Sequence, residues 1–284
     1  MTIRRTTAVP VLAATALALT ALTGCGSGGS GGSAPAAAVG TASASASASV
    51  SATATASATA AAVGAPAGAD GAFDPAVAIA HRSREPYAAN VVLVSETGEG
   101  DQQVRITVTG RMNYYTPARG ARTEGKTVMG GALVLNWMET LTADGVGYHR
   151  DKAKGETKWT KDLQSGEGAD ANGEQVAGYA KALLETGPAA RKGMETELGL
   201  PVFHLAGRLT MDQVREADPS NAARMAAQGV DGVDCELWID RLGRGVRGVQ
   251  SMVVNGKTVV TKDQYSNFGP ADTFAAPLPG EIAP

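Results

Sequence analysis

The sequence predicts an α+β protein built on one long, curved antiparallel β-sheet with helices packed on a single face. Segments in which apolar and polar residues alternate open and close the part of the chain after residue 70, and helical periodicity occupies its middle. Gly- and Asp-bearing turns separate the alternating segments, as in an antiparallel meander. The resulting order of strands, helices, a strand, helices and strands is typical of an α+β fold.

A short helix and a β-hairpin are the first elements that the sequence predicts. Residues 73–80 form the helix, with Asp74 as its N-cap and Pro75 at the first helical position. Residues 90–95 are apolar and β-branched, and residues 104–109 alternate with period two after a Gly-rich turn, which predicts the hairpin. Further strands are expected at residues 112–115, 126–129, 132–141, 145–150 and 158–159.

The middle of the chain is predicted to be helical. From Glu174 onward, apolar residues recur at helical spacing until Gly187-Pro188 ends the run, and a second short helix is expected over residues 189–198. Asn255-Gly256 predicts a two-residue hairpin turn, since both residues tolerate positive φ. The remaining expected elements are a strand at 200–209, helices at 211–217 and 220–228, and strands at 233–240, 246–255 and 257–268.

The N-terminus has the pattern of a bacterial export signal. Arg4 and Arg5 precede an apolar run over residues 8–22, which is short and rich in alanine for a membrane span. Leu22-Thr23-Gly24-Cys25 has the form of a lipobox, so residues 1–24 are interpreted as a lipoprotein signal peptide. Diacylglycerol on Cys25 would hold the protein at the outer face of the cell membrane. The alternative is an ordinary signal peptide that contains a cysteine.

Residues 25–70 are predicted to be the lipidated cysteine and a disordered tether. They are dominated by Gly, Ser, Ala, Thr, Pro and Val, without an aromatic residue and without a charge before Asp70. Such a composition buries too little apolar surface to offset the entropy of ordering. A flexible coil of this kind spans roughly 35–40 Å. Residues 71–284 then form a single folded domain of ordinary size.

Charge and cysteine content exclude several classes of function. The formal charge of −3 becomes −5 once the signal peptide, with Arg4 and Arg5, is removed. An acidic domain without basic clusters is not expected to bind nucleic acid or to coat an anionic membrane. If Cys25 is lipidated, Cys235 is unpaired, and its apolar surroundings predict a buried structural thiol rather than a reactive one.

The sequence offers no positive evidence for catalysis, a cofactor or a metal. Residues 243–248 fit G-x-G-x-x-G, but strand-like residues follow where a nucleotide site needs a helix, so a hairpin turn is expected. His81, His149 and His204 lack the spacing of zinc ligands, and no G-x-S-x-G elbow is present. We therefore do not expect an enzyme.

The last third of the chain resembles actinobacterial envelope lipoproteins of the LppX/LprG type. The similar segments are residues 199–209, 235–247 and 265–270, together with Ala276-Pro277. The fold of that family is similar to that of the LolA/LolB lipoprotein carriers. Leu242 departs from the small or polar turn residue usual in the family. The residues that fit the pattern are Trp238, Asp240, Gly243, Arg247, Tyr265, Ser266, Asn267, Phe268, Gly269, Ala276 and Pro277.

The resemblance implies a half-barrel whose concave face, covered by helices, encloses an apolar cavity for acyl chains. It implies a carrier or acceptor of lipids or lipoglycans in the cell envelope. The alternative is a packed interaction or sensor module without lipid cargo, and the two differ in cavity volume, because a carrier needs at least several hundred Å³ or so. At each position, ordinary core packing is the alternative to cavity lining. The candidate lining residues are Val104, Ile106, Val108, Leu133, Leu135, Trp137, Tyr179, Leu183, Phe203 and Leu205.

Overall fold

The computed structural model describes residues 66, 68, 71–116, 120–162 and 169–284. The predicted signal peptide, Cys25 and nearly all of the predicted tether lie outside the described residues.

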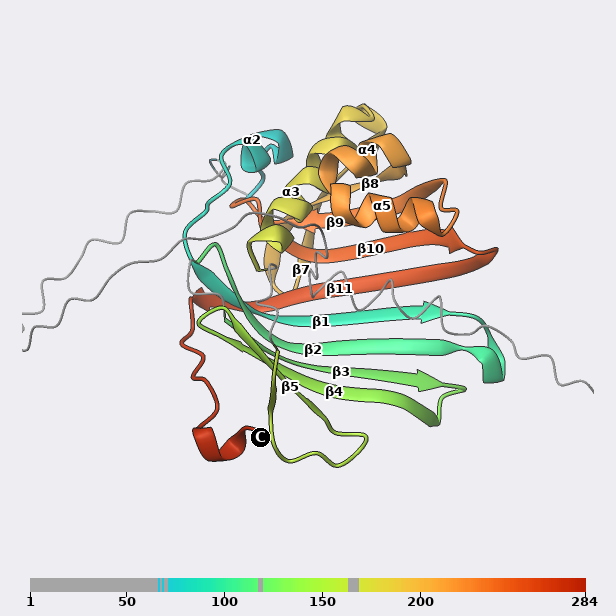
Figure 1. Cartoon of the computed structure of the whole chain (residues 1–284). Helices are drawn as coiled ribbons and strands as arrows, with labels where there is room; N and C mark the ends of the chain where they lie inside the picture. Colours follow the sequence, from blue (N-terminus) through green and yellow to red (C-terminus); the bar gives the residue numbers. More distant parts are fainter. Residues whose placement is uncertain (1–65, 67, 69–70, 117–119, 163–168) are drawn as a thin grey trace, which may run out of the picture.

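One unclosed antiparallel sheet of 11 strands forms the framework of the described chain (Figure 1). Its spatial order is β6-β5-β4-β3-β2-β1-β11-β10-β9-β8-β7, so β1 and β11 pair in the middle and join the two halves. The predicted α+β class is therefore confirmed. The strands are β1 Tyr87–Thr97, β2 Val104–Tyr114, β3 Ala121–Met129, β4 Leu133–Ala143, β5 Val146–Asp151, β6 Thr160–Lys161, β7 Arg191–Glu197, β8 Leu200–Thr210, β9 Gly232–Ile239, β10 Gly245–Val254 and β11 Lys257–Pro270.

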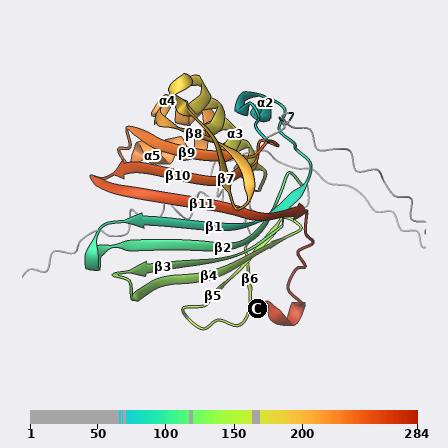
Figure 2. The same cartoon turned by 180° about the vertical axis from the view of Figure 1, so that it is seen from behind.

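The helices gather over the β7–β11 half of the sheet, as both views show (Figures 1 and 2). We call the face on which they pack the concave face and the opposite one the convex face. In the described part of the chain, no helix has the length and apolar character needed to cross a bilayer. The helices are α2 Pro75–Ala80, α3 Ala169–Glu185, α4 Met211–Ala217 and α5 Pro219–Ala227, with 3₁₀ turns η2 Gly100–Gln102, η3 Pro188–Ala190 and η4 Pro279–Glu281.

Local sequence accounts for the helix ends. The Asp74 carboxylate accepts a hydrogen bond from the Ala76 amide at 2.8 Å, and Pro75 opens α2, as predicted. Thr210 and Gln213 form a capping box at the start of α4. Asp218 caps α5, whose first residue is Pro219, so the predicted break between the two helices is confirmed.

The main core lies between the helices and the concave face of β8–β11. Leu183 of α3 and Val214 of α4 pack there against Leu205 and Val233, and all of these are fully buried. Cys235 belongs to the same cluster, where burial raises the pKa of its thiol far above the ordinary value. It is a buried structural cysteine, as predicted.

Two predicted elements are wrong. Residues 189–198, predicted as a helix, form η3 and the edge strand β7, which pairs with β8 through a turn at Leu198 and Gly199, both with positive φ. Residues 158–159, predicted as a strand, precede β6, and Trp159 makes a single parallel bridge to Ile282. In addition, residues 112–115, predicted as a separate strand, continue β2 as far as Tyr114.

The C-terminal segment after β11 packs on the β3–β5 half of the sheet. Phe274 and Ile282 contact a cluster of Leu141, Tyr148 and Trp159. The side-chain amide of Asn113 donates a hydrogen bond to the carbonyl oxygen of Asp272 at 2.8 Å, and its Oδ1 accepts one from the Asp272 amide at 2.9 Å. Arg111 also pairs with the Asp272 carboxylate. The segment thereby covers apolar side chains at this end of the convex face.

Candidate ligand-binding site

The concave face of β1 and β2 carries a second apolar cluster, outside the main core. Leu93 of β1 forms it with Val104, Ile106 and Val108 of β2, and Met129 of β3 packs against it. Leu93 pairs with Val108, so the two side chains lie on the same face. Ile106 and Val104 are two and four positions before Val108 in β2, and alternate residues of a strand share a face. The four side chains are 3–7% exposed, so the cluster is buried, and among the described helices α3 is the one that contacts β2.

A small interior cavity adjoins this cluster beneath α3. Its volume is about 60 Å³, enough for a few water molecules. Leu93 belongs both to its wall and to the apolar cluster, so the cavity borders the cluster. The other lining residues are Gln175, Val176 and Tyr179 of α3, Asn221 of α5, Leu237 of β9, Gln250 of β10, and Thr261, Asp263 and Tyr265 of β11.

Asp263 is the one formally charged residue in the lining of this cavity. It pairs with Leu93 on one side and with Gly248 on the other, so it lies in the middle of the sheet. A Cβ at Gly248 would lie 2.5 Å from Asp263 Oδ1, so the glycine makes room for the carboxylate. Burial raises the pKa of Asp263 to about 6, although a hydrogen bond from the Tyr265 hydroxyl opposes the shift.

A group of tyrosines closes one end of the cavity. Tyr87 and Tyr114 stack with ring centroids 4.8 Å apart, and Tyr265 meets Tyr114 edge to face at 6.3 Å. Tyr265 lines both the cavity and a smaller space of about 10 Å³, which also touches Tyr115, Val176 and Arg244. The hydroxyl groups of Tyr114 and Tyr179 are buried without a hydrogen-bond partner of standard geometry among the described residues.

Nine of the ten predicted lining residues divide into four groups. Val104, Ile106 and Val108 belong to the apolar cluster of β1 and β2. Tyr179 lines the cavity. Leu183 and Leu205 belong to the packed main core, and Phe203 packs against it and against Phe73. Leu133 and Leu135, at the start of β4, are exposed.

Trp137 does not lie on the concave face. Its strand partner is Lys126, and both Lys126 and Lys152 place their ammonium groups over its ring, at 5.2 and 4.6 Å. Val108 of β2 lies on the concave face, so its strand partner Gly125 and the partner of Gly125, Met138, lie on that face too. Trp137 is the residue before Met138 in β4, so its side chain points to the convex face. We therefore leave it out of the candidate site.

Sequence reasoning missed the polar members of the cavity, above all Asp263. A usable signal exists in β11, because the inward positions Val259, Thr261 and Tyr265 alternate with outward ones, and Asp263 falls in the inward series. A charged residue at an inward strand position is rare enough to suggest a function. The sequence pattern identifies Tyr265 as part of the C-terminal motif but does not predict that it lines the cavity.

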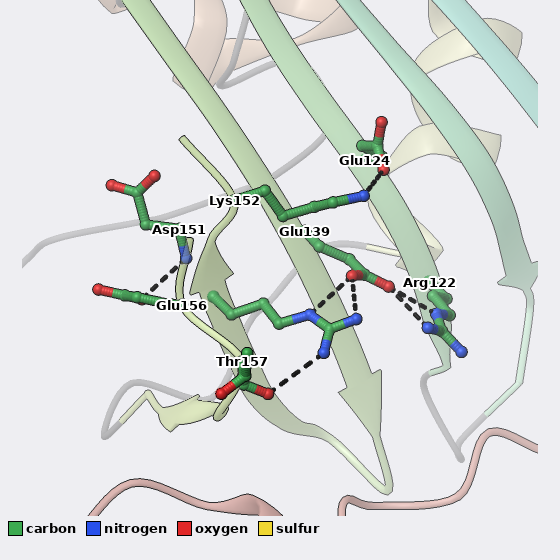
Figure 3. Close-up of polar contacts among 8 residues, drawn as sticks. Arg122, Glu124, Glu139, Asp151, Lys152, Glu156 and Thr157 are labelled. Atoms are coloured by element: carbon green, nitrogen blue, oxygen red, sulfur yellow. Dashed lines mark hydrogen bonds and ion pairs between the residues drawn. The ribbon is translucent and has the colours of Figure 1, made fainter. Parts of the chain in front are cut away.

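The convex face of β3–β5 carries a cluster of charges (Figure 3). Arg122 and Arg150 bind opposite oxygens of Glu139, each with two hydrogen bonds of 2.6–2.9 Å. Burial of Glu139 favours the neutral acid, but these hydrogen bonds keep its pKa below the ordinary value. Lys152, which directly follows β5, binds Glu124 of β3 at 2.6 Å across the intervening strand β4. Opposite charges are paired throughout, so we interpret this cluster as a cross-strand brace.

A second convex cluster joins the edge strand β7 to the sheet. The Trp238 ring lies between His204, stacked at 4.1 Å, and the Arg247 guanidinium at 4.3 Å. Glu195 of β7 accepts hydrogen bonds from Trp238 Nε1 at 2.7 Å and from His204 Nδ1 at 2.8 Å, which lower the pKa of its carboxyl. No group of side chains in the described ranges has the composition and geometry of a metal site.

The G-x-G-x-x-G segment is a hairpin turn between β9 and β10. The Asp240 carboxylate accepts hydrogen bonds from the amides of Leu242 and Arg244, at 2.9 and 3.0 Å, and pairs with the Arg244 guanidinium. Gly243 has φ +76°, and a Cβ there would lie 2.7 Å from the carbonyl oxygen of Ala78. The glycine is therefore required by the turn and by the approach of α2.

Comparisons with known proteins found similar solved structures at low sequence identity. No family model and no curated protein matches the chain. Among solved structures, the chain is similar to LprF from Mycobacterium bovis, at 15% identity over 68% of this chain and 90% of that one, with a TM-score of 0.34. It is also similar to the lipoprotein LppX from Mycobacterium tuberculosis, at 10% identity over 66% and 89%, with a TM-score of 0.27.

A LolA superfamily protein from Nitrosomonas europaea is a third similar structure. The identity is 10% over 66% of this chain and 87% of that one, and the TM-score is 0.22.

Proposed function

We propose that this protein is a membrane-anchored, extracytoplasmic lipoprotein that binds acyl-chain ligands on its concave face. One observation carries the proposal: a buried apolar cluster of Leu93, Val104, Ile106 and Val108 lies on the concave face apart from the main core, and its member Leu93 also lines the cavity beneath α3. The lipobox ending at Cys25 supports the anchor and the location.

The energetics suit an acyl chain. Each buried methylene contributes about 0.8 kcal/mol, so a chain of ten methylenes gains roughly 8 kcal/mol before the costs of association. Roughly 8 kcal/mol corresponds to about micromolar affinity, and the costs of association weaken the binding from that value. Such affinity permits uptake and release, as a carrier requires.

The alternative function is a packed interaction or sensor module without lipid cargo. It is favoured by the dense packing of the helix-covered half, where Leu183 and Leu205 are fully buried, and by a cavity of about 60 Å³, small for an entire lipid. The two functions differ in the role of the β1–β2 cluster, which binds a chain in the first and is plain core in the second.

Binding of a fluorescent fatty-acyl probe distinguishes these functions. Ile106→Gln places an amide in the expected path of the chain and should weaken binding about tenfold or more, because burying an unpaired amide costs at least 1–3 kcal/mol or so. Val92→Gln is the matched control, since Val92 lies on the neighbouring strand, is 41% exposed and points to the convex face. Equal binding by both variants, or no uptake by the unaltered chain, contradicts lipid binding.

Anchoring is tested separately by Cys25→Ser. The altered chain should lose its membrane association and appear in the soluble fraction, because no acyl chains are attached. The comparison is made by phase separation in a mild detergent and by the mass of the N-terminal peptide. An altered chain that stays with the membrane, or an unaltered N-terminal peptide without diacylglycerol, contradicts the anchor.

A further inference from the structure

The cavity beneath α3 has an unusual charge distribution for an apolar binding site. Asp263 is part of its lining, which contains no lysine, arginine or histidine. Asp218, at the junction of α4 and α5, adds a second negative charge, since it accepts a hydrogen bond from Gln175 of the cavity wall. The nearby Arg244 is already paired with Asp240, at 2.6 Å. The interior carboxylate therefore has no cationic partner among the described residues.

An interior carboxylate without a counter-ion is costly, and it favours a ligand that brings a positive charge. The rings of Tyr179 and Tyr265 line the same cavity. Carboxylate and tyrosine faces together are the usual partners of an ammonium group. A phosphate or a free carboxylate would instead meet a like charge without a neutralising donor. The volume of about 60 Å³ holds an amine head and its first methylene, but not a bulky head group.

We propose that this cavity binds the ammonium group of an amine-bearing amphiphile, with Asp263 as its counter-ion. The apolar chain runs from Leu93 along the concave face toward Val108 and Ile106, so the inference rests on the proposed function. It adds a specificity-determining residue and a class of ligand: a long-chain primary amine is preferred over the alcohol and the acid of the same length.

The surroundings of Asp263 define the pH range of this preference. The titratable groups that face it are Tyr265 on its own strand, Tyr114 from β2 and Cys235 from β9, and burial raises the pKa of each well above its ordinary value. These groups stay neutral between pH 5 and 8. Tyr179 of α3, whose pKa burial also raises, lines the same cavity and stays neutral too, while Asp218 is the charged group at its border. Asp263, with a pKa of about 6, is the group that changes its charge.

The test compares dodecylamine, 1-dodecanol and dodecanoic acid by calorimetry at pH 8, below the concentrations at which they form micelles. The protein is the chain from residue 25 onward with Cys25→Ser, which needs no detergent. Dodecylamine should bind at least about tenfold more tightly than dodecanol, as expected for a charge-assisted hydrogen bond. The preference should shrink toward one as the pH falls below about 6, because Asp263 becomes neutral.

Two variants locate the preference at Asp263. Asp263→Asn should abolish the preference for the amine and change dodecanol binding by less than about twofold, since the shape of the site is kept. Gly248→Ala displaces the carboxylate and should weaken the amine selectively. Asp101→Asn, at an exposed turn residue, is the control and should leave all three affinities unchanged.

The outcomes separate this inference from the proposed function. If dodecanol and dodecanoic acid bind but dodecylamine is not preferred, or if Asp263→Asn keeps the preference, the inference is overturned and acyl-chain binding stands. If none of the three ligands binds, both are overturned.

Discussion

Asp263→Asn is expected to raise the free energy of unfolding at pH 8 by about 2–3 kcal/mol and to change it little at pH 4. Burial raises the pKa of Asp263 from 3.8 to about 6 in the folded protein. A group with a raised folded pKa stabilises the fold fully below the unfolded pKa, and this stabilisation is lost as the pH rises through the folded pKa. About two pKa units at roughly 1.4 kcal/mol each give the expected size.

Urea denaturation of the unaltered chain and the variant, at both pH values, measures this difference. Glu124, Glu139 and Glu195 have lowered pKa values and destabilise the fold in acid, but they do so equally in both proteins and cancel. Asp101→Asn should have no such effect at either pH. A variant that is less stable at pH 8 means that Asp263 has a cationic partner, and a variant that is equally stabilised at both pH values means that the gain does not come from removing a buried charge.

A gain in stability on removing the Asp263 carboxylate would indicate that this residue serves ligand binding rather than folding. Natural proteins retain destabilising charges mainly where function requires them. The expected pattern is therefore a more stable protein that has lost its preference for amines.

Trp238→Ala is expected to destabilise the protein by about 3–5 kcal/mol, the usual cost of truncating a buried tryptophan. The ring is 4% exposed, and both of its faces are covered, by His204 and Arg247. Its removal also takes away the Nε1 hydrogen bond to Glu195, the contact that ties β7 to β9. The edge strand should therefore open before the rest of the sheet.

Chemical denaturation and amide hydrogen exchange measure the two parts of this expectation. Trp238→Phe is the matched variant, because it keeps an aromatic ring between His204 and Arg247 and loses the hydrogen bond, at a cost of about 1 kcal/mol. Amides of residues 191–197 should lose protection in both variants, most in the alanine one. Unchanged protection of this strand, or a loss of stability below 1 kcal/mol in Trp238→Ala, contradicts the described packing.

The elements that sequence predicts well are those fixed by local chemistry. Asp74-Pro75 starts α2 because the cap and the proline act within one turn. Asn255-Gly256 forms its hairpin with φ values of 50° and 76°, as its residue types require. Residues 189–198 are predicted as a helix, and their Arg, Lys, Met and Glu residues are good helix formers, but the pairing of residues 191–197 with β8 overrides that preference. Leu198 adopts a positive φ in the turn between β7 and β8, and leucine is not a residue type that predicts such a turn.

The candidate site was predictable in part. Alternation in β2 placed Val104, Ile106 and Val108 on one face, and the structure gathers them in one cluster. Alternation alone does not predict which residues of β4 point to the concave face, because a bulge between Val134 and Asn136 shifts the register there. As a result, Trp137 lies on the convex face. The cavity itself depends on how α3 and α5 cross the sheet, which no local pattern in the sequence encodes.

Native mass spectrometry of the full-length protein, extracted from the membranes of its own host, tests acyl-chain binding most directly. A covalent anchor adds a constant mass, whereas a bound ligand leaves on collisional activation. We expect a population that carries one additional acyl lipid, lost on activation and reduced in Ile106→Gln but not in Val92→Gln. A single species with the mass of the anchored chain alone, unchanged by activation and the same in both variants, would show that the concave face is plain core.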